Sequence, residues 1–177
     1  MENYKKNLEL LTKNYVYSKE MEHDACGVGL IASTEGKKSR AIVEYGIEAL
    51  KAVWHRGAVD ADGKTGDGAG IHVEIPKDFF IEKIQVTGHD YDNSEICVGM
   101  IFLPRNDYSA QENCKTIVES ELTKNNFSIY GWRQVPVNPK VLGEKALQTM
   151  PEIIQVLFKS NDPNLLDKNL ERKIYEI

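Results

Sequence analysis

Apolar runs and amphipathic segments alternate along this 177-residue chain. Residues 27–33 and 70–75 have the small and β-branched apolar composition of buried strands. A continuous apolar run at residues 96–103 predicts a strand that is covered on both faces. Residues 127–137 and 153–158 predict two further strands, the second of them buried. The pattern therefore predicts a domain with substantial sheet content.

Helical spacing fills the intervals between these strands. From Arg40 to His55, apolar residues recur every three or four positions and charged residues take the opposite side, which predicts an amphipathic helix capped by Ser39. Further helices are predicted to begin near residue 78 and to span residues 109–124 and 163–175. The predicted core face of the first helix comprises Val43, Ile47, Leu50, Val53 and Trp54.

The first residues of the chain mix charges with isolated apolar side chains. They lack the apolar core of a secretory signal, and residues 8–11 could form a short helix or belong to a mobile terminus. No stretch of the chain approaches the roughly 20 apolar residues that a membrane-spanning helix needs. The order of helices and strands suits an α+β domain, and periodicity alone leaves several such folds open.

Composition narrows the function without naming it. The chain is 41% hydrophobic and 28% charged, which is ordinary for one globular domain, and its net charge is -5. No basic cluster favours nucleic acid or an anionic membrane, so small molecules or proteins are the expected partners. The three cysteines, Cys26, Cys97 and Cys114, are too widely spaced for a disulfide framework or a zinc site. We therefore expect a reducing compartment, the cytoplasm.

Cys26 has the most distinctive chemistry in the chain. It follows Asp24 and Ala25 and opens the apolar segment that begins at Gly27. If the chain were cut after Ala25, the thiol would lie beside a free α-amine, whose pKa of about 7.7–8.0 allows it to act as a base near neutral pH. Such a residue carries its own general base. The alternative is that Cys26 is a small hydrophobic residue buried in a strand.

Three motifs in order carry a resemblance to a known family. Cys26 to Ala32, Trp54 to Ala58 and Lys64 to Ile71 resemble the class II glutamine amidotransferase domain at the front of the glutamate synthase large subunit. The similarity continues through residues 151–156 and 170–175. The resemblance implies the α+β fold of N-terminal nucleophile hydrolases, a four-layer α-β-β-α sandwich.

The resemblance also implies a division of the chain and a reaction. Residues 1–25 would be a propeptide-like leader, and residues 26–177 the N-terminal part of the amidotransferase domain. Cys26, freed by cleavage, would attack the side-chain amide of L-glutamine and release ammonia. The ammonia would convert 2-oxoglutarate to glutamate on separate synthase domains with FMN and an iron–sulfur cluster. Expected partners are the rest of the large subunit and a partner that supplies reductant, whereas no cofactor is expected in this segment.

Further site residues follow from matching motifs. Arg56, with Gly57, is expected to brace the nucleophile and lower its thiol pKa; the alternative is a charge that favours the end of a helix. Gly66, Asp67, Gly68 and Gly70 would form a loop near the active site.

The glycines of that loop would let the backbone approach other backbone or a substrate. A phosphate-binding loop is disfavoured, because the Lys-Ser/Thr ending and a following helix are missing. Asp60, Asp62 and Asp67 lack the glutamate of a calcium loop, so a solvated loop is expected there.

The remaining candidates receive structural roles. His55 is expected to be packed or solvated, Trp54 to lie in the core, and Cys97 to be inert within its apolar run. Cys114 falls on a predicted helix.

One family motif is missing. Class II amidotransferases bind the oxyanion with an Asn-Gly pair, and this sequence contains none. The chain is therefore expected to be a truncated part of the domain and a poor catalyst alone. The alternative is a non-catalytic module that acts in protein interaction or regulation. Other class II amidotransferases are disfavoured, because they usually begin at the cysteine after only the initiator methionine.

Overall fold

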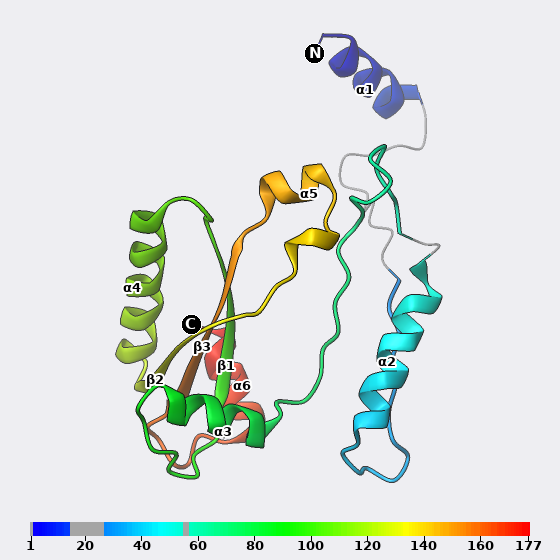
Figure 1. The fold of residues 1–177 in the computed structure, drawn as a ribbon. Helices are drawn as coiled ribbons and strands as arrows, with labels where there is room; N and C mark the ends of the chain where they lie inside the picture. Colours follow the sequence, from blue (N-terminus) through cyan, green and yellow to red (C-terminus); the bar gives the residue numbers. More distant parts are fainter. Residues whose placement is uncertain (1, 15–26, 55–56) are drawn as a thin grey trace. The chain divides into compact units, whose positions relative to one another are not determined.

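The computed structural model describes residues 2–14, 27–54 and 57–177. The chain divides into two compact units, Met1–Ala58 and Val59–Ile177. Figure 1 shows their helices and strands coloured along the sequence. None of the described helices is long and apolar enough to cross a membrane.

The first unit contains helices α1 (Glu2–Asn14) and α2 (Arg40–Ala52). The Ser39 Oγ accepts a hydrogen bond from the Ala41 N–H at 3.2 Å, which confirms the predicted cap of α2. The α1 helix confirms the helical alternative for the start of the chain.

The predicted core face of α2 is only partly right. Val43, Ile47 and Leu50 are half-buried, but Val53 and Trp54 are exposed, Trp54 by 74%. Because α2 ends at Ala52, these two side chains lie beyond its last turn and leave its apolar stripe. The prediction that Trp54 is a core residue is therefore wrong.

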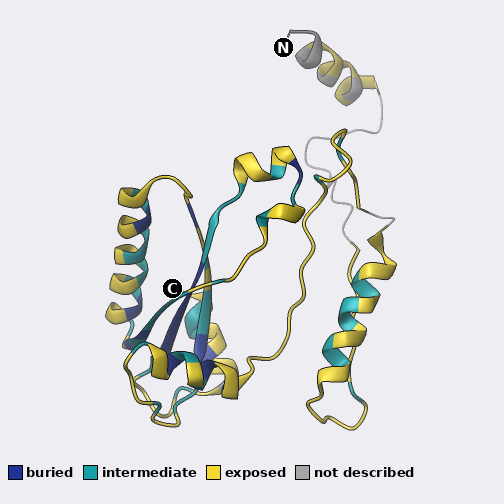
Figure 2. Cartoon of the chain, in the orientation of Figure 1, coloured by how far each residue is buried: buried dark blue, intermediate teal, exposed yellow. Residues whose placement is uncertain are grey.

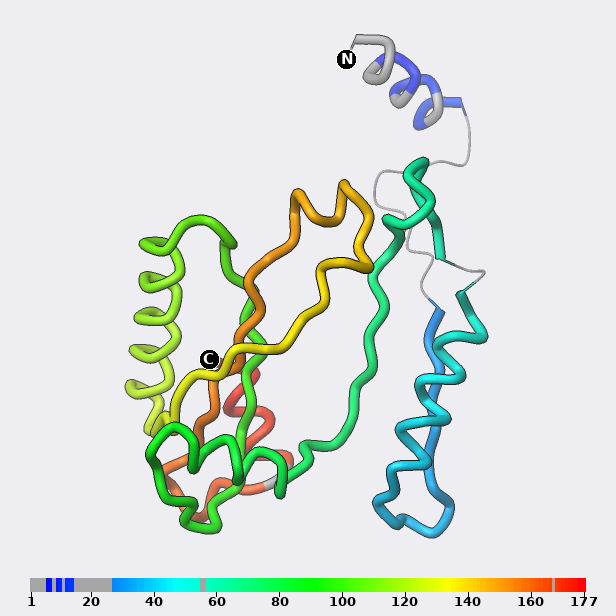
Figure 3. The backbone as a smooth tube through the Cα atoms, in the orientation of Figure 1, coloured from blue at the N-terminus to red at the C-terminus, as the bar shows by residue number. Residues whose placement is uncertain are grey.

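Two predicted strands are absent from the described structure. Residues 27–33 and 70–75 form neither helix nor strand, and Figure 3 follows the course of their backbone. Val28 and Leu30 are 95% and 90% exposed. An apolar segment becomes a strand only where a neighbouring strand pairs with its N–H and C=O groups. Within the described ranges no strand pairs with either segment, so their composition alone does not produce a ladder.

The second unit is built on a three-stranded antiparallel sheet. Its strands are β1 (Cys97–Leu103), β2 (Phe127–Gln134) and β3 (Glu152–Ser160), in the order β1-β3-β2. Cys97 lies opposite Phe158 in one pair, and Phe127 lies opposite Ser160 in the other. All three strands confirm predicted ones. The combination of helices with an antiparallel sheet confirms the α+β class.

Helices pack on both faces of this sheet. On one face, α4 (Tyr108–Lys124) and α6 (Asp167–Tyr175) place Leu122 and Leu170 against Val156 and Phe158. On the other, α3 (Lys77–Val86) places Phe80 and Ile84 against Leu157 and Tyr130. Figure 2 shows the buried strands between these helices. The short helices η2 (Pro139–Val141) and α5 (Glu144–Thr149) lie between β2 and β3 in the chain.

The α3 face of the sheet is only partly covered. Val98 packs with α3, but Met100 and Phe102, which point to the same face, are 48% and 63% exposed. The prediction that this run is covered on both faces is therefore wrong. The reason is the position of α3, which packs near Val98 and Leu157 and leaves the other end of β1 open.

A polar cluster ties the loop before β1 to the sheet. The Asp92 carboxylate accepts hydrogen bonds from the Tyr130 hydroxyl at 2.9 Å and from the Lys159 ammonium. Lys159, followed by Ser94, holds the pKa of the Asp92 carboxyl well below its usual range. Burial, followed by the Asp92 carboxylate, raises the pKa of Tyr130. The cluster is therefore built around an ionised Asp92.

We expect Asp92→Asn to lower the free energy of unfolding at pH 7 by up to about 1 kcal/mol, the size typical of exposed ion pairs. The folded-state pKa of Asp92 is lowered, so its contribution is present above the unfolded pKa of about 3.9 and is lost as the pH falls. Urea unfolding of the unsubstituted protein and of Asp92→Asn, at pH 7 and at pH 3, measures the difference between their free energies of unfolding. Asp90→Asn is the matched control, and a difference of equal size at both pH values would contradict the charge-based account.

Candidate functional site

The predicted nucleophile and its predicted arginine, Cys26 and Arg56, lie outside the described residues. Gly57 is described and exposed, and its N–H donates to the Trp54 carbonyl at 3.0 Å in the turn after α2. A Cβ on Gly57 would lie 3.3 Å from that carbonyl oxygen. The roles of Cys26, Arg56 and Gly57 thus remain predictions.

Residues 59–66 form a closed loop in the second unit. Val59 and Gly66 pair in an antiparallel bridge, and the Asp60 N–H donates to the Thr65 carbonyl at 2.7 Å. Within the loop, the Gly63 N–H donates to the Asp60 carbonyl at 2.9 Å. Gly63 has a φ of +69°, which only glycine adopts without strain. The loop ends at Gly66, where the predicted active-site segment begins.

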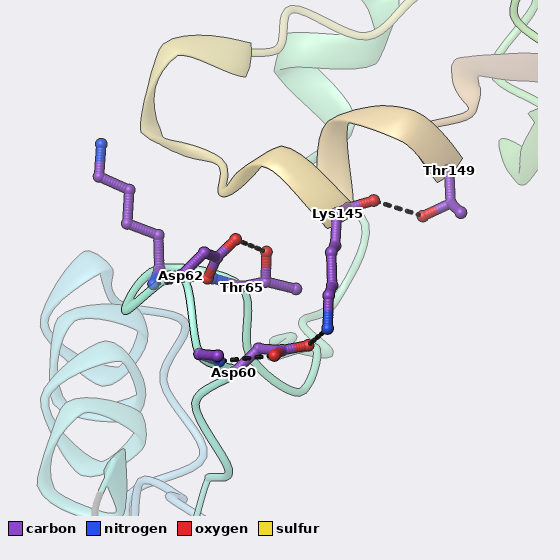
Figure 4. A network of polar contacts seen from close by, with 7 residues as sticks. Asp60, Asp62, Thr65, Lys145 and Thr149 are labelled. Atoms are coloured by element: carbon purple, nitrogen blue, oxygen red, sulfur yellow. Dashed lines mark hydrogen bonds and ion pairs between the residues drawn. The ribbon is translucent and has the colours of Figure 1, made fainter.

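Asp62 organises this closed loop (Figure 4). Its Oδ1 accepts from the N–H groups of Lys64 at 2.9 Å and Thr65 at 2.7 Å, and its Oδ2 accepts from the Thr65 hydroxyl at 2.5 Å. The Thr65 hydroxyl, followed by the backbone N–H groups, holds the pKa of the Asp62 carboxyl well below its usual range. Asp62 is therefore ionised at neutral pH.

Lys145 connects the loop to the start of α5. Its Nζ donates to the Asp60 Oδ2 at 2.6 Å, across 85 positions of sequence. Gly143 is the N-cap of α5 and offers no side-chain acceptor. The Asp60–Lys145 ion pair therefore joins the closed loop to the first turn of α5.

The fit between the loop and α5 leaves no room for a side chain at Gly143. Gly143 is buried. A Cβ there would lie 2.2 Å from Thr65 Oγ1, 2.3 Å from Asp62 Oδ2 and 2.6 Å from the Thr65 backbone nitrogen. The last of these atoms is backbone, so the loop itself would have to move.

The aspartates of this region do not form a metal site. The Asp60 and Asp62 carboxylates accept from Lys145, Thr65 and backbone N–H groups. Among the residues that the structure describes, no group of His, Cys, Asp or Glu could hold a metal ion.

The glycines of the predicted active-site segment lie in open space. Gly66, Gly68 and Gly70 are exposed, as is Asp67. A Cβ on Gly68 or Gly70 would meet no atom of the described residues within 4 Å. Close approach to other backbone or to a substrate stays the prediction for these glycines.

The structure describes two cysteines, Cys97 and Cys114, and both are free thiols. Burial, followed by the charge of Glu95, raises the pKa of the Cys97 thiol to about 12, so it is protonated at neutral pH. This confirms the prediction that Cys97 is inert. Cys114 is a half-buried free thiol on α4, as its predicted helical position implied.

Sequence reasoning missed Gly143 and Lys145. The contacts of Asp62 with Lys64 and Thr65 do have a signal in the sequence. An aspartate in a turn often accepts hydrogen bonds from the backbone N–H groups two and three residues later. Gly143 and Lys145 carry no such signal, because their partners lie some 80 positions earlier in the chain.

Comparisons with known proteins give consistent matches. Residues 26–177 match the family model described as "Glutamine amidotransferases class-II". The chain is 52% identical over 174 residues to the glutamate synthase [NADPH] large chain of Azospirillum brasilense, covering 98% of this chain and 11% of that protein.

More distant relatives give the same picture. The ferredoxin-dependent glutamate synthase of Pyropia yezoensis is 38% identical over 167 residues, covering 94% of this chain and 10% of that protein. The glutamate synthase [NADH] of Saccharomyces cerevisiae is 35% identical over 173 residues, covering 92% of this chain and 8% of that protein. The chain therefore spans only about a tenth of the length of these relatives.

Proposed function

Since the chain belongs to the class II glutamine amidotransferases, we propose that it is the glutamine-hydrolysing segment of a glutamate synthase, with Cys26 as its nucleophile. The observation that carries the proposal is the start of the family match at Cys26 itself. Chemical reasoning selects the same residue, because cleavage before it would create a thiol with its own base. The identity with glutamate synthases over nearly the whole chain supports the same assignment.

The proposed reaction is acyl transfer from nitrogen to sulfur and then to water. After removal of residues 1–25, the α-amine of Cys26 takes the thiol proton, and the sulfur attacks the side-chain amide carbon of glutamine. The tetrahedral intermediate expels its nitrogen, which takes a proton from the α-ammonium and leaves as ammonia. Water then attacks the thioester carbon, and the carbon–sulfur bond breaks. The products are glutamate, ammonia and the regenerated thiol.

Arg56 and the glycine segment have proposed supporting roles. A fixed positive charge near Cys26 would favour its thiolate, which is the role we assign to Arg56 with Gly57. The exposed Gly66, Asp67, Gly68 and Gly70 would lie against the substrate.

The remaining functions of a glutamate synthase are proposed for the rest of the large subunit. There, ammonia would meet 2-oxoglutarate, with FMN and an iron–sulfur cluster and with reductant from a partner. The structure describes two cysteines, Cys97 and Cys114, both free thiols, whereas most iron–sulfur clusters are held by four cysteine thiolates. We assign no cofactor to this segment and place the protein in the cytoplasm, where thiols stay reduced.

The partly open sheet supports the finer fold assignment. Met100 and Phe102 leave apolar surface on the α3 face of β1. In the four-layer α-β-β-α sandwich that we propose, a second sheet would cover this surface.

A second candidate function is a non-catalytic amidotransferase-like module that acts through protein interaction. The absence of an Asn-Gly pair from the sequence favours this second candidate, because such a pair would bind the oxyanion. Each oxyanion donor typically contributes about 100- to 1000-fold to the rate. Release of ammonia from glutamine by the isolated protein would exclude this candidate.

Processing at Cys26 tests the proposed function. We expect the protein isolated from cells to have lost residues 1–25 by intact mass. The new N-terminus should then react with a cyanobenzothiazole probe, which forms a stable ring only with an N-terminal cysteine. Cys26→Ala is the matched control and should take no label. A protein that hydrolyses glutamine while it retains its leader would refute the amine as the base.

A further inference from the structure

We propose that Asp62, Gly143 and Lys145 are positioning residues of the glutamine site: they fix the glycine segment 66–70 by docking the closed loop 59–66 on the start of α5. This inference rests on the proposed function, because that function places segment 66–70 against the substrate. The three residues would act through the loop and not by contact with the reacting atoms.

Two separate contacts hold the loop in one position. The Asp60–Lys145 ion pair, 2.6 Å long, links the loop to the first turn of α5 by charge. The Asp62 carboxylate lies against Gly143 at the start of α5, where a Cβ would come within 2.3 Å of its Oδ2, and it binds Thr65 beside Gly66. One side chain thus lies between the helix start and the residue that precedes the glycine segment. A movement of α5 would therefore be transmitted to Gly66 through the ion pair and through the Asp62 carboxylate.

The network is poorly suited to a role in overall stability. The Asp60 and Lys145 side chains remain 33% and 63% exposed, and exposed ion pairs contribute about 0–1 kcal/mol. The α5 helix has no buried residue and adds nothing to the two hydrophobic clusters of the sheet. What the network does determine is the position of the loop. Its tight fit at Gly143 supports this reading, since a single methyl group would displace Thr65.

The segment that it would hold needs such support. Residues 67–76 form no helix or strand, so their backbone is not fixed by a ladder of hydrogen bonds. A site for a small amino acid requires its contacts to be placed within fractions of an ångström, and a displacement of 1 Å can cost about 100-fold. Anchoring Gly66 therefore bears directly on recognition of glutamine.

The test compares substituted variants, each made in the full protein and used in the form isolated from cells. Lys145→Met removes the ion pair, Asp62→Asn removes the charged acceptor, and Gly143→Ala forces the loop and helix apart. Lys145→Arg keeps the charge and should retain function. Lys140→Met, at an exposed lysine on η2, is the matched control.

Two measurements separate positioning from folding. Amide hydrogen exchange should be faster by roughly tenfold for residues 59–70 in the three disruptive variants, and unchanged in β3. The second measurement is the rate at which Cys26 reacts with a diazoketone analogue of glutamine, divided by its rate with iodoacetamide. In the first reaction the sulfur binds the diazo-bearing carbon, which takes the thiol proton as dinitrogen leaves. Poor positioning should lower this ratio roughly ten- to 100-fold. A change in the general exposure of the Cys26 thiol would alter both rates alike and would leave the ratio unchanged.

Each outcome has a distinct meaning. A lowered ratio with retained β3 protection, rescued by Lys145→Arg, supports the proposal. Suppose that the unsubstituted protein prefers the glutamine analogue and that the variants have the same ratio. The positioning role is then overturned, and the amidotransferase assignment stays intact. Unchanged exchange at residues 59–70 also overturns it. If the unsubstituted protein shows no preference for the analogue, the amidotransferase assignment fails first and the positioning role fails with it.

Discussion

Replacing Cys26 by alanine is expected to abolish release of ammonia from glutamine, by on the order of ten thousandfold or more in kcat. The proposed mechanism forms a thioester on this sulfur, and the buried Cys97 does not fit that role. Cys97 is buried with a thiol pKa of about 12, so it is protonated at neutral pH. Ammonia release coupled to an optical assay measures the effect on the isolated protein.

Cys114→Ala is the control for this substitution, because Cys114 is the half-buried free thiol of α4. Its activity should equal that of the unsubstituted protein. The nucleophile assignment would be wrong if Cys26→Ala kept more than a small fraction of the activity. If neither the unsubstituted protein nor Cys114→Ala released ammonia, the non-catalytic module would become the better account.

The largest effect on stability that we predict for a one-carbon change is at Gly99 in β1. A Cβ on Gly99 would lie 2.7 Å from the Val156 Cγ1 on β3, inside the core between the sheet and α4. Gly99→Ala should therefore lower the free energy of unfolding by about 1–3 kcal/mol, the usual cost of overpacking. Urea unfolding followed by circular dichroism measures it.

A double-mutant cycle tests the cause of that loss. Val156→Ala alone should destabilise the fold by at least about 1.5 kcal/mol, since Val156 is buried. In the double variant the clash is gone, so the total loss should be smaller than the sum by about 1 kcal/mol or more. Gly29→Ala, with no atom within 4 Å of its Cβ, is the control and should change stability by less than about 0.5 kcal/mol. Simple additivity at Gly99 and Val156 would refute the clash.

The sequence predicted well those elements whose signal is local. The helix α4 and the buried strand β3 follow from periodicity and composition, and their observed bounds, Tyr108–Lys124 and Glu152–Ser160, contain or nearly match the predicted ranges. The failures depend on neighbours. Residues 27–33 and 70–75 have the composition of strands but lack a pairing strand in the described structure. Met100 and Phe102 have the pattern of a doubly covered strand but only partial cover on one face.

The candidate site shows the same division. Cys26 is a candidate from the sequence alone because its proposed chemistry depends on two adjacent positions, and the family match begins at that residue. Lys145 carries no such signal, because its partner Asp60 lies 85 positions earlier in the chain. An exposed lysine with a distant partner has the same sequence signature as any solvated lysine.

The long separation of Asp60 and Lys145 has a consequence for the order of folding. Bringing together two residues 85 positions apart in a free chain costs roughly 4 kcal/mol in loop-closure entropy. An exposed ion pair returns about 0–1 kcal/mol, so this contact cannot form first. It becomes favourable once β2 and β3 have paired and brought α5 into place. The docking of the closed loop on α5 is thus a late step of folding, whereas the local hydrogen bonds within residues 59–66 can form before the sheet is complete.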